Sequence, residues 1–479
     1  MEASTIDYAI IFSFLAAIAI YGSISGGRQK SVEDYFLGSK QVSWWAVCFA
    51  IVAAETSTLT FISIPGLAYL TNLNFLQVTF GYLLGRLVVA GLFLPAYHKS
   101  ELKTAYSFLE NRFGGKTRTF ASIVFIFTRA AADGVRLFAT AIPLYLILNI
   151  EPVFAIILIA LIALIYTYTG GLKGVIKVDV ILMFLYIGSA LLATVYLVKL
   201  IPGGWFAVFQ TASAENKFSV FNLGFDSGIE GFFSNPYTLI GGIIGGAFLS
   251  MASHGTDQLI VQRLLATRDV KSAQKAIIGS GVIVIIQFAI FLVLGVMLFS
   301  YYGPMDIKSD EIFPKFIIEV LPPGITGIII AGLFAAAMST LAGSMSALSS
   351  SVMIDIYTPL IGPGIDEKKK LKISRLLTIL WAILLILSAM IFMGSSQAVV
   401  ETALSIASFT YGGLLGTFLL GLLFKNVKQN EALIGFASGI AVMIFIIFFT
   451  NIGWTWYTLI GVTVTIFSGV TLSRFNLKE

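Results

Sequence analysis

Long apolar runs dominate this chain and limit what it can fold into. They lie near residues 6–26, 43–70, 75–98, 119–148, 152–169, 176–201, 236–263, 273–302, 323–356, 373–393, 397–424, 431–450 and 454–473. About 20 predominantly apolar helical residues cross the hydrocarbon core of a bilayer, and these runs are close to that length or longer. We therefore predict an all-α membrane protein with about 13 transmembrane helices surrounded by lipid.

The composition agrees with this prediction and excludes an ordinary soluble protein. Charged residues make up 11% of the 479 residues, against roughly a quarter in soluble domains. The first apolar run begins with acidic residues, Glu2 and Asp7, and is long enough to span a bilayer. We interpret it as a true first helix rather than a signal peptide, which would begin with basic residues.

The basic residues predict the orientation in the membrane. With the N-terminus outside, the predicted outer loops hold only Lys217, Lys308 and Lys315 of the 30 lysines and arginines. Those in or near predicted spans are Arg86, Arg129, Arg136 and Lys199. Because lysine and arginine concentrate in cytoplasmic loops, we expect a multi-pass protein of the cell (inner) membrane with an outer N-terminus and a cytoplasmic C-terminus. The net charge of +5 then reflects topology, and we expect no nucleic-acid partner.

Ionisable residues inside the spans are few, and such residues are costly in lipid and commonly functional. Glu55 lies mid-span with no basic residue within a helical turn, which favours a functional role. Arg129, Asp133 and Arg136 share a helix face at spacings of four and three residues. They fit a self-neutralised structural pair or a substrate site equally well. The others are Arg86, His254, Asp257 and Glu401.

Two spans contain glycine and proline where a helix could be interrupted. Residues 63–66 (Ser-Ile-Pro-Gly) lie in the second span, and residues 241–246 with His254 and Gly255 lie in the seventh. Unwound backbone at membrane depth is tolerated around a cavity, and its free carbonyls are natural sodium ligands. Each span opens a set of five, which indicates a transporter built from an inverted repeat.

The ninth span is rich in hydroxyl groups. They belong to Ser339, Thr340, Ser344, Ser346, Ser349, Ser350 and Ser351. Uncharged oxygens suit a dehydrated alkali cation, but hydroxyls also form hydrogen bonds between closely packed helices. The composition leaves these two interpretations equal.

Several motifs, in this order, resemble those of the solute:sodium symporter family over nearly the whole chain. They are DYFLG at 34–38 followed by Trp44 and Trp45, TAYSFLENRF at 104–113, GGLKGVIKVDV at 170–180, DQLIVQR at 257–263, and the serine-rich span ending in Asp355, Ile356 and Tyr357. The resemblance implies a leucine-transporter-type fold with an inverted five-plus-five repeat core.

This fold predicts a division of the chain. Residues 1–42 would hold an extra helix and an inner loop, 43–201 the first repeat (core helices 1–5), 202–235 an outer loop, 236–424 the second repeat (core helices 6–10), and 425–479 two extra helices.

The resemblance also implies a sodium site between the broken first core helix and the eighth. The matching positions are Ala53, Thr56, Ala336, Ser339 and Thr340. Asp179 matches an acidic residue near the inner end of the family's sodium path, which some members combine with further serines to hold a second sodium ion. Ala342 and Gly343 stand at those serine positions, so we expect one sodium ion per cycle.

The resemblance further suggests which solutes the pocket disfavours. Thr60, Leu404 and a position near Ile285 lack the polar side chains with which the sugar carriers hold sugar. In the sialic-acid carriers, hydroxyls on the first core helix and an arginine on the third hold a carboxylate. Ser57 and Thr60 keep the hydroxyls. Ala132 occupies the arginine position, but Arg129 and Arg136 flank it by about one turn.

We therefore predict a secondary active transporter that couples sodium to the uptake of a small polar solute, with carboxylates and amino acids, including sialic acid, favoured. The candidate substrate-binding residues are Glu55, Ser57, Thr60, Phe75, Thr79, Tyr82, Arg129, Asp133, Arg136, His254 and Glu401. The alternatives are a proton-coupled or uncoupled carrier on the same fold, with Glu55 or Asp179 as proton site, or a sugar symporter with a rebuilt pocket. No nucleophile–base pair or metal-ligand cluster points to an enzyme, and sodium is the only ion or cofactor we expect.

Overall fold

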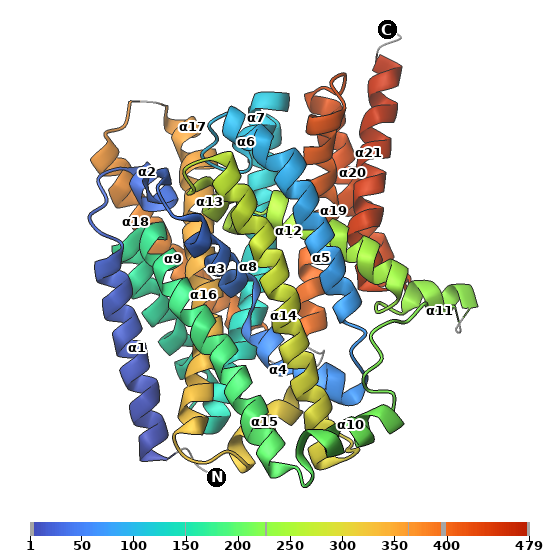
Figure 1. Cartoon of the computed structure of the whole chain (residues 1–479). Coiled ribbons are helices and arrows are strands. Elements are labelled where there is room, and N and C mark those ends of the chain that lie inside the picture. The colour runs from blue at the N-terminus through green and yellow to red at the C-terminus, as the bar shows by residue number, and fades with distance from the viewer. Residues whose placement is uncertain (1–3, 149, 226–227, 363, 394–398, 477–479) are drawn as a thin grey trace.

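Every regular element of the described residues is a helix. The computed structural model describes residues 4–148, 150–225, 228–362, 364–393 and 399–476, and in α19 the side chains from Thr410 onward. The long helices run roughly along one axis, with the N-terminus at one end of the molecule and the C-terminus at the other (Figure 1). The predicted odd number of spans requires ends placed in this way.

The helices fall into groups along the chain. Those of the predicted first half are α3 (Trp44–Glu55), α4 (Thr58–Leu70), α5 (Leu76–Val88), α6 (Leu94–Lys99), α8 (Gly115–Leu148) and α9 (Pro152–Leu200). Those of the second are η3 (Gly241–Gly245), α12 (Gly246–Gly255), α13 (Gln258–Leu265), α14 (Val270–Tyr302), α16 (Ile325–Ser351), α18 (Glu367–Ile391) and α19 (Val399–Leu423). Outside these lie α1 (Thr5–Ser25), α20 (Gln429–Phe449) and α21 (Tyr457–Asn476).

Eight helices of the described residues are long and apolar enough to cross a membrane, or nine if the bent pair α3–α4 is one span. The 49-residue helix α9 would be about 73 Å long if straight, more than twice the hydrocarbon thickness. At Gly171 the backbone leaves helical geometry (φ 56°, ψ −166°), so α9 consists of two limbs joined by a kink. The structure thus supports a many-helix membrane protein, and the count of thirteen stays a prediction.

The first broken helix is interrupted at Thr56, so the predicted break at residues 63–66 is wrong. Helices α3 and α4 are bent by 61° across this point, where Thr56 is extended (φ −85°, ψ 97°). Helix α4 continues through Pro65. A Cβ at the next residue, Gly66, would overlap the backbone of Ser309 in α15 (Ser309–Glu319). Gly66 therefore allows close approach of two helices, and the Pro-Gly pair does not unwind the backbone.

The second broken helix is interrupted at Thr256, between α12 and α13. The glycine run ahead of it forms the π-helical turn η3, which confirms that this span departs from regular α geometry. Glycines here also allow α12 and α5 to approach closely, since a Cβ at Gly246 would lie 2.5 Å from the carbonyl oxygen of Val78. The break follows the predicted residues His254 and Gly255 directly.

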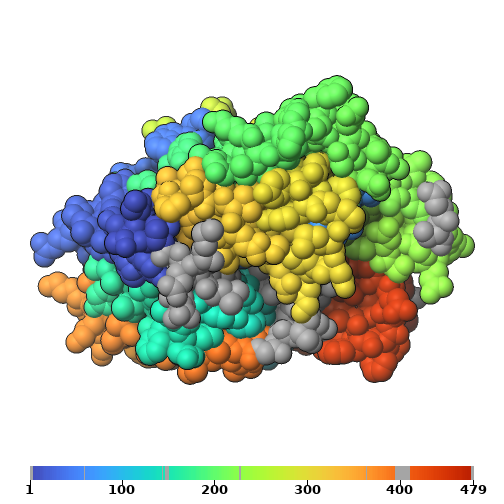
Figure 2. Space-filling model, turned by 90° about the horizontal axis from the view of Figure 1, so that it is seen from below, coloured from blue at the N-terminus to red at the C-terminus, as the bar shows by residue number. Residues whose placement is uncertain are grey.

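Several segments that the charge pattern assigns to one side share one end of the molecule, although α11 (Gly228–Ser234), from the same predicted outer loop as α10, lies at mid-height (Figure 1). Helix α10 (Gly204–Ala214) and α15, from the predicted outer loops, lie at the N-terminal end, and Figure 2 shows their loops side by side on that face. The predicted inner segments α2 (Val32–Leu37), α7 (Ser107–Phe113) and α17 (Thr358–Ile361) lie at the C-terminal end. Which end faces the cytoplasm remains a prediction.

Candidate functional site

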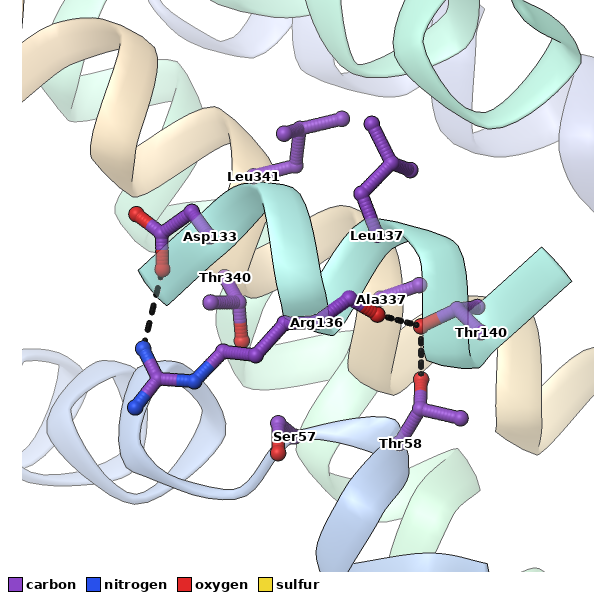
Figure 3. Close-up of a pocket in the computed structure, with 9 residues that line it drawn as sticks. All are labelled: Ser57, Thr58, Asp133, Arg136, Leu137, Thr140, Ala337, Thr340 and Leu341. Carbon is purple, nitrogen blue, oxygen red and sulfur yellow. Dashed lines mark hydrogen bonds and ion pairs between the residues drawn. The ribbon is translucent and has the colours of Figure 1, made fainter. Parts of the chain in front are cut away.

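A small cavity lies at the break between α3 and α4, where α8 and α16 approach it (Figure 3). Its lining residues are Ser57, Thr58, Asp133, Arg136, Leu137, Thr140, Ala337, Thr340 and Leu341. Hydrogen bonds fix the break in place, since the Thr140 hydroxyl bonds to that of Thr58 at 2.7 Å. Three predicted substrate residues, Ser57, Asp133 and Arg136, therefore line one cavity, together with the predicted sodium position Thr340.

Arg136 contributes the cavity's positive charge. Its Nη1 donates to Asp133 Oδ1 at 2.9 Å, and its side chain is 22% exposed. Asp133 is the only hydrogen-bond partner of this guanidinium among the described residues. Because a guanidinium has five N–H donors, the rest of the group can bind a carboxylate in bidentate geometry.

The Asp133 carboxylate is fully engaged by neighbouring groups. Its Oδ1 accepts from Arg129 Nη1 at 3.3 Å as well as from Arg136, and its Oδ2 accepts from the Ser344 hydroxyl. Arg129 pairs in addition with Asp257. The ion pair that the sequence allows is therefore present for both arginines, and a substrate role for either stays a prediction.

A second small cavity brings four of the five predicted sodium positions together where α3 ends against α16. Ala53, Thr56, Ala336 and Ser339 line it. The Thr340 hydroxyl lies 3.3 Å from the carbonyl oxygens of both Ala54 and Ala336. The other lining residues are Gln287 and the mainly apolar Leu182, Met183, Tyr186 and Ala335, and sodium binding here stays a prediction.

Gln287 of α14 also lines this cavity, and the sequence reasoning missed it. Its Nε2 donates to the Thr56 hydroxyl at 2.7 Å, and that hydroxyl donates to Val52 O at 2.5 Å. The Thr56 amide donates to the same carbonyl at 3.0 Å. This contact from a distant helix, which no local pattern indicates, helps to hold the break open.

Asp179 lies beside the predicted sodium positions, fully buried on α9. Its Oδ1 accepts from the Ser339 hydroxyl at 2.6 Å, and its Oδ2 accepts from Arg263 Nη2 at 3.0 Å. Lys177, two residues earlier on α9, donates to Ser25 O at 2.9 Å. Sequence reasoning missed Arg263 because it lies on α13, although it ends the motif at 257–263.

The Arg263 guanidinium also fills the space beside Gly343. A Cβ at Gly343 would lie 2.5 Å from Arg263 Nη2 and 2.9 Å from Nη1. A serine at this position would therefore displace a fully buried guanidinium. The expectation of one sodium ion stays a prediction.

Glu55 is paired across helices. Its carboxylate binds Arg86 of α5 and lies 3.4 Å from His254 Nε2 of α12, and Arg86 Nη2 lies 3.0 Å from the same nitrogen. Local spacing could not reveal these partners, because they come from other helices. Glu55 and His254 thus belong to a buried charge cluster, and their roles as substrate ligands stay predictions.

Four other predicted substrate residues line neither the cavity at the α3–α4 break nor the other cavity that Arg136 lines. Thr60 and Tyr82 are buried in α4 and α5, and Phe75 stacks on Phe288 with ring centroids 5.1 Å apart. The Thr79 hydroxyl donates to Leu76 O in its own helix at 2.8 Å. Glu401 lies in α19, and its side chain is outside the described part of the structure.

Most hydroxyls of the serine-rich helix α16 bond to other helices. Ser346 and Ser350 accept from Gln262 and Gln258 of α13 at 3.2 and 3.1 Å, and Ser351 bonds to Ser122 of α8 at 2.9 Å. Interhelical hydrogen bonding therefore accounts for these residues. Ser339 and Thr340 are the two that also lie at the predicted sodium positions.

Comparison with known proteins identifies one family of relatives. A family model described as "Sodium:solute symporter family" matches residues 35–439. The sodium/sialic acid symporter SiaT of Proteus mirabilis (strain HI4320) is 30% identical over 471 residues, covering 97% of this chain and 94% of that protein. The sodium/glucose cotransporter of Vibrio parahaemolyticus is 29% identical over 484 residues, covering 93% and 87%.

Solved structures give the same fold. A Na+-coupled sialic acid symporter in a substrate-bound, outward-open state matches with a TM-score of 0.89 and 29% identity over 98% of each chain. Mhp1, a nucleobase-cation-symport-1 family transporter, matches with a TM-score of 0.60 and 12% identity over 92% of this chain and 94% of that one, and supports the fold alone. The chain is therefore a multi-pass transporter that couples solute movement to sodium, not an enzyme. It belongs to the sodium:solute symporter family.

Proposed function

We propose that this protein couples inward sodium movement to the uptake of a small organic solute that carries a carboxylate group. The observation that carries the proposal is Arg136, which lines the cavity at the α3–α4 break and has one partner among the described residues. A charge-assisted, bidentate bond to a carboxylate is the strongest interaction that this cavity can offer. The Ser57 side chain on the same cavity adds a further polar contact.

The solute class follows from the groups that remain available. Asp133 is already bound by two guanidiniums and a hydroxyl, so among the described lining residues it is not available to a ligand, while Arg136 keeps further N–H donors. Sialic acid is one candidate because two relatives are named as sialic acid symporters. Amino acids, other carboxylates and a sugar in a rebuilt pocket are the alternatives to be tested.

We assign the coupling ion to Ala53, Thr56, Ala336, Ser339 and Thr340. A sodium ion there would join the end of α3 to α16. Thr56 lines this cavity and its neighbour Ser57 lines the Arg136 cavity, so both ligands would stabilise the same break. Such linkage is reciprocal, since an ion that strengthens solute binding is itself bound more tightly by the solute-loaded protein.

Alternating access would then move the two ligands toward the C-terminal end, which we place in the cytoplasm. The halves 43–201 and 236–424 would rearrange around the two broken helices, as inverted repeats do in this type of transporter. Asp179 would act on the ion through Ser339, whose hydroxyl it holds. These assignments rest on the positions of the residues and on the charge pattern.

Uptake into proteoliposomes tests the proposal. Purified protein is given radiolabelled sialic acid, pyruvate, proline and glucose, with and without an inward sodium gradient. We expect sodium-dependent accumulation of a carboxylate, and a loss of about tenfold or more in apparent affinity for Arg136→Leu, because a hydrogen bond to a charged group contributes about 1.5–3 kcal/mol. Arg136→Lys keeps the charge but loses the planar guanidinium, so its apparent affinity should lie between those of the unaltered protein and Arg136→Leu.

Two results would count against the proposal. Accumulation of glucose that Arg136→Leu leaves unchanged would contradict the carboxylate assignment. Uptake driven by a pH gradient in sodium-free buffer would favour a proton-coupled carrier.

A further inference from the structure

A third cavity lies next to the one at the helix break, and Arg136 lines both. Its polar lining includes Arg129 of α8, Asp257 at the break between α12 and α13, and Tyr411 of α19. Arg129 precedes Arg136 by about two helical turns, or about 10 Å along the axis. Because α8 follows directly after α7 at the C-terminal end, Arg129 lies on the side toward which we expect the solute to leave.

Arg129 and Tyr411 converge on a single carboxylate, that of Asp257. Its Oδ2 binds Arg129 Nη2 and accepts from the Tyr411 hydroxyl at 2.7 Å. Arg129 Nη2 also lies 3.3 Å from that hydroxyl oxygen. All three side chains are buried. A guanidinium and a phenol that donate to one carboxylate form a carboxylate-binding site, and here the ligand is the protein's own side chain.

Asp257 sits at a point where the chain can move. It is the N-cap residue of α13, and its Oδ1 accepts from Leu259 N at 2.9 Å. Helices α12 and α13 meet at this residue, so a change in their angle would carry the Asp257 carboxylate away from Arg129. Broken helices of this kind are the elements that change between states in inverted-repeat transporters.

We propose that Arg129 and Tyr411 form a second carboxylate subsite, which Asp257 fills in this conformation and the carboxylate of the solute occupies during release. The inference rests on the proposed function. Asp133 bonds to both Arg129 and Arg136, at 3.3 and 2.9 Å, so each guanidinium keeps a counter-charge while a ligand passes from one to the other. The solute would thus leave in two steps along one face of α8.

Chemical rescue of Asp257→Ala tests the subsite without any transported solute. This substitution removes one carboxylate group, and formate has the size and charge of the group removed. We expect the variant to melt at a lower temperature than the unaltered protein, since it leaves Arg129 buried without one of its carboxylates. Added sodium formate should then raise its melting temperature with the logarithm of concentration, as a ligand that binds the folded state does.

The controls separate a specific site from a salt effect. Sodium chloride at equal concentration should not produce this rise, and formate should not rescue the double variant Asp257→Ala with Arg129→Met. Equal responses to formate and chloride, or equal responses in the single and double variants, would overturn the proposal. If Asp257→Ala does not fold, Asp257→Ser replaces it, because serine can still cap Leu259 but is smaller than the carboxylate that it replaces, and the same outcomes apply.

The result is independent of the uptake assay on Arg136. Failure of every carboxylate to accumulate would remove the proposed function and leave the formate result to stand as a property of Arg129. Normal sodium-coupled uptake of a carboxylate without formate rescue would remove the second subsite alone.

Discussion

Ser339 shows how one hydroxyl can be oriented for a cation. It donates its only hydrogen to Asp179 Oδ1 at 2.6 Å. A hydroxyl has one hydrogen and two lone pairs, so its lone pairs remain free to accept or to bind a metal ion. Asp179 in turn is balanced by Arg263, which prevents an unpaired buried charge. We therefore regard Asp179 as a positioning residue for the proposed sodium site.

Replacing the hydroxyls of Ser339 and Thr340 should weaken sodium dependence selectively. We expect Ser339→Ala and Thr340→Val each to raise the sodium concentration for half-maximal uptake by about tenfold or more, because each removes an ion-binding oxygen. The measurement is initial uptake against sodium concentration in proteoliposomes.

Ser349→Ala is the matched control on the same helix. The Ser349 hydroxyl is buried but bonds to Met345 O within α16, at 2.6 Å. Its loss should leave the sodium response unchanged. Equal sodium curves for Ser339→Ala, Ser349→Ala and the unaltered protein would remove Ser339 from the site.

At the scale of single residues, the family motifs predicted which residues lie near one another. Spacing along one helix did not predict their ion-pair partners. Four of the five sodium positions found by resemblance line one cavity between α3 and α16, and the fifth, Thr340, bonds to Ala54 O of α3. The partners of Glu55 and Asp179 are Arg86, His254 and Arg263, each on another helix. Pairing of this kind depends on how helices cross, which hydropathy and spacing within a single span do not encode.

At the scale of the helices, the shape of α9 depends on one residue. Gly171 has φ 56° and ψ −166°, a conformation that essentially only glycine adopts. A Cβ there would also lie 2.8 Å from Tyr35 O of α2. The two limbs of α9, and the contact of α2 with the kink between them, therefore depend on the absence of a side chain.

Gly171→Ala should destabilise the protein by about 1–3 kcal/mol through backbone strain, with a further cost from the contact with Tyr35. Thermal unfolding in detergent measures the change. Gly188→Ala on the same helix is the control, because Gly188 is helical and a Cβ there would meet nothing within 4 Å. That variant should be neutral or more stable by up to about 1 kcal/mol. A larger loss for Gly188→Ala than for Gly171→Ala would contradict this account.

The positions of the breaks were harder to predict than the spans themselves. Pro65 removes one backbone donor from α4, yet the helix continues through it. Thr56 is neither glycine nor proline, and the break there is held by Gln287 of α14 and by the Thr58–Thr140 bond to α8. The position of the break thus depends on tertiary contacts. The glycine and proline pattern could indicate only that this helix is interrupted.

At the scale of the whole molecule, cysteine labelling can determine which end faces the cytoplasm. Cys48 is the only cysteine and is buried, so Cys48→Ser provides a background free of thiols. Lys308 and Lys369 are exposed and belong to a predicted outer and a predicted inner segment. We expect a membrane-impermeant maleimide to label Lys308→Cys in intact cells, and Lys369→Cys only after permeabilisation. The reverse pattern would invert the orientation and the direction of transport that we propose.

The Arg263 guanidinium beside Gly343 bears on how such a carrier would be powered. It is a cation fixed to the chain, where it fills the space beside Gly343 and pairs with Asp179, and we expect a single sodium ion to be carried. One sodium ion carried with one monocarboxylate transfers no net charge, so membrane voltage, at about 2.3 kcal/mol per charge per 100 mV, would contribute nothing to the overall cycle. The accumulation ratio of such a solute could then not exceed the ratio of sodium concentrations across the membrane. A neutral or zwitterionic solute would instead be carried electrogenically and could be concentrated further.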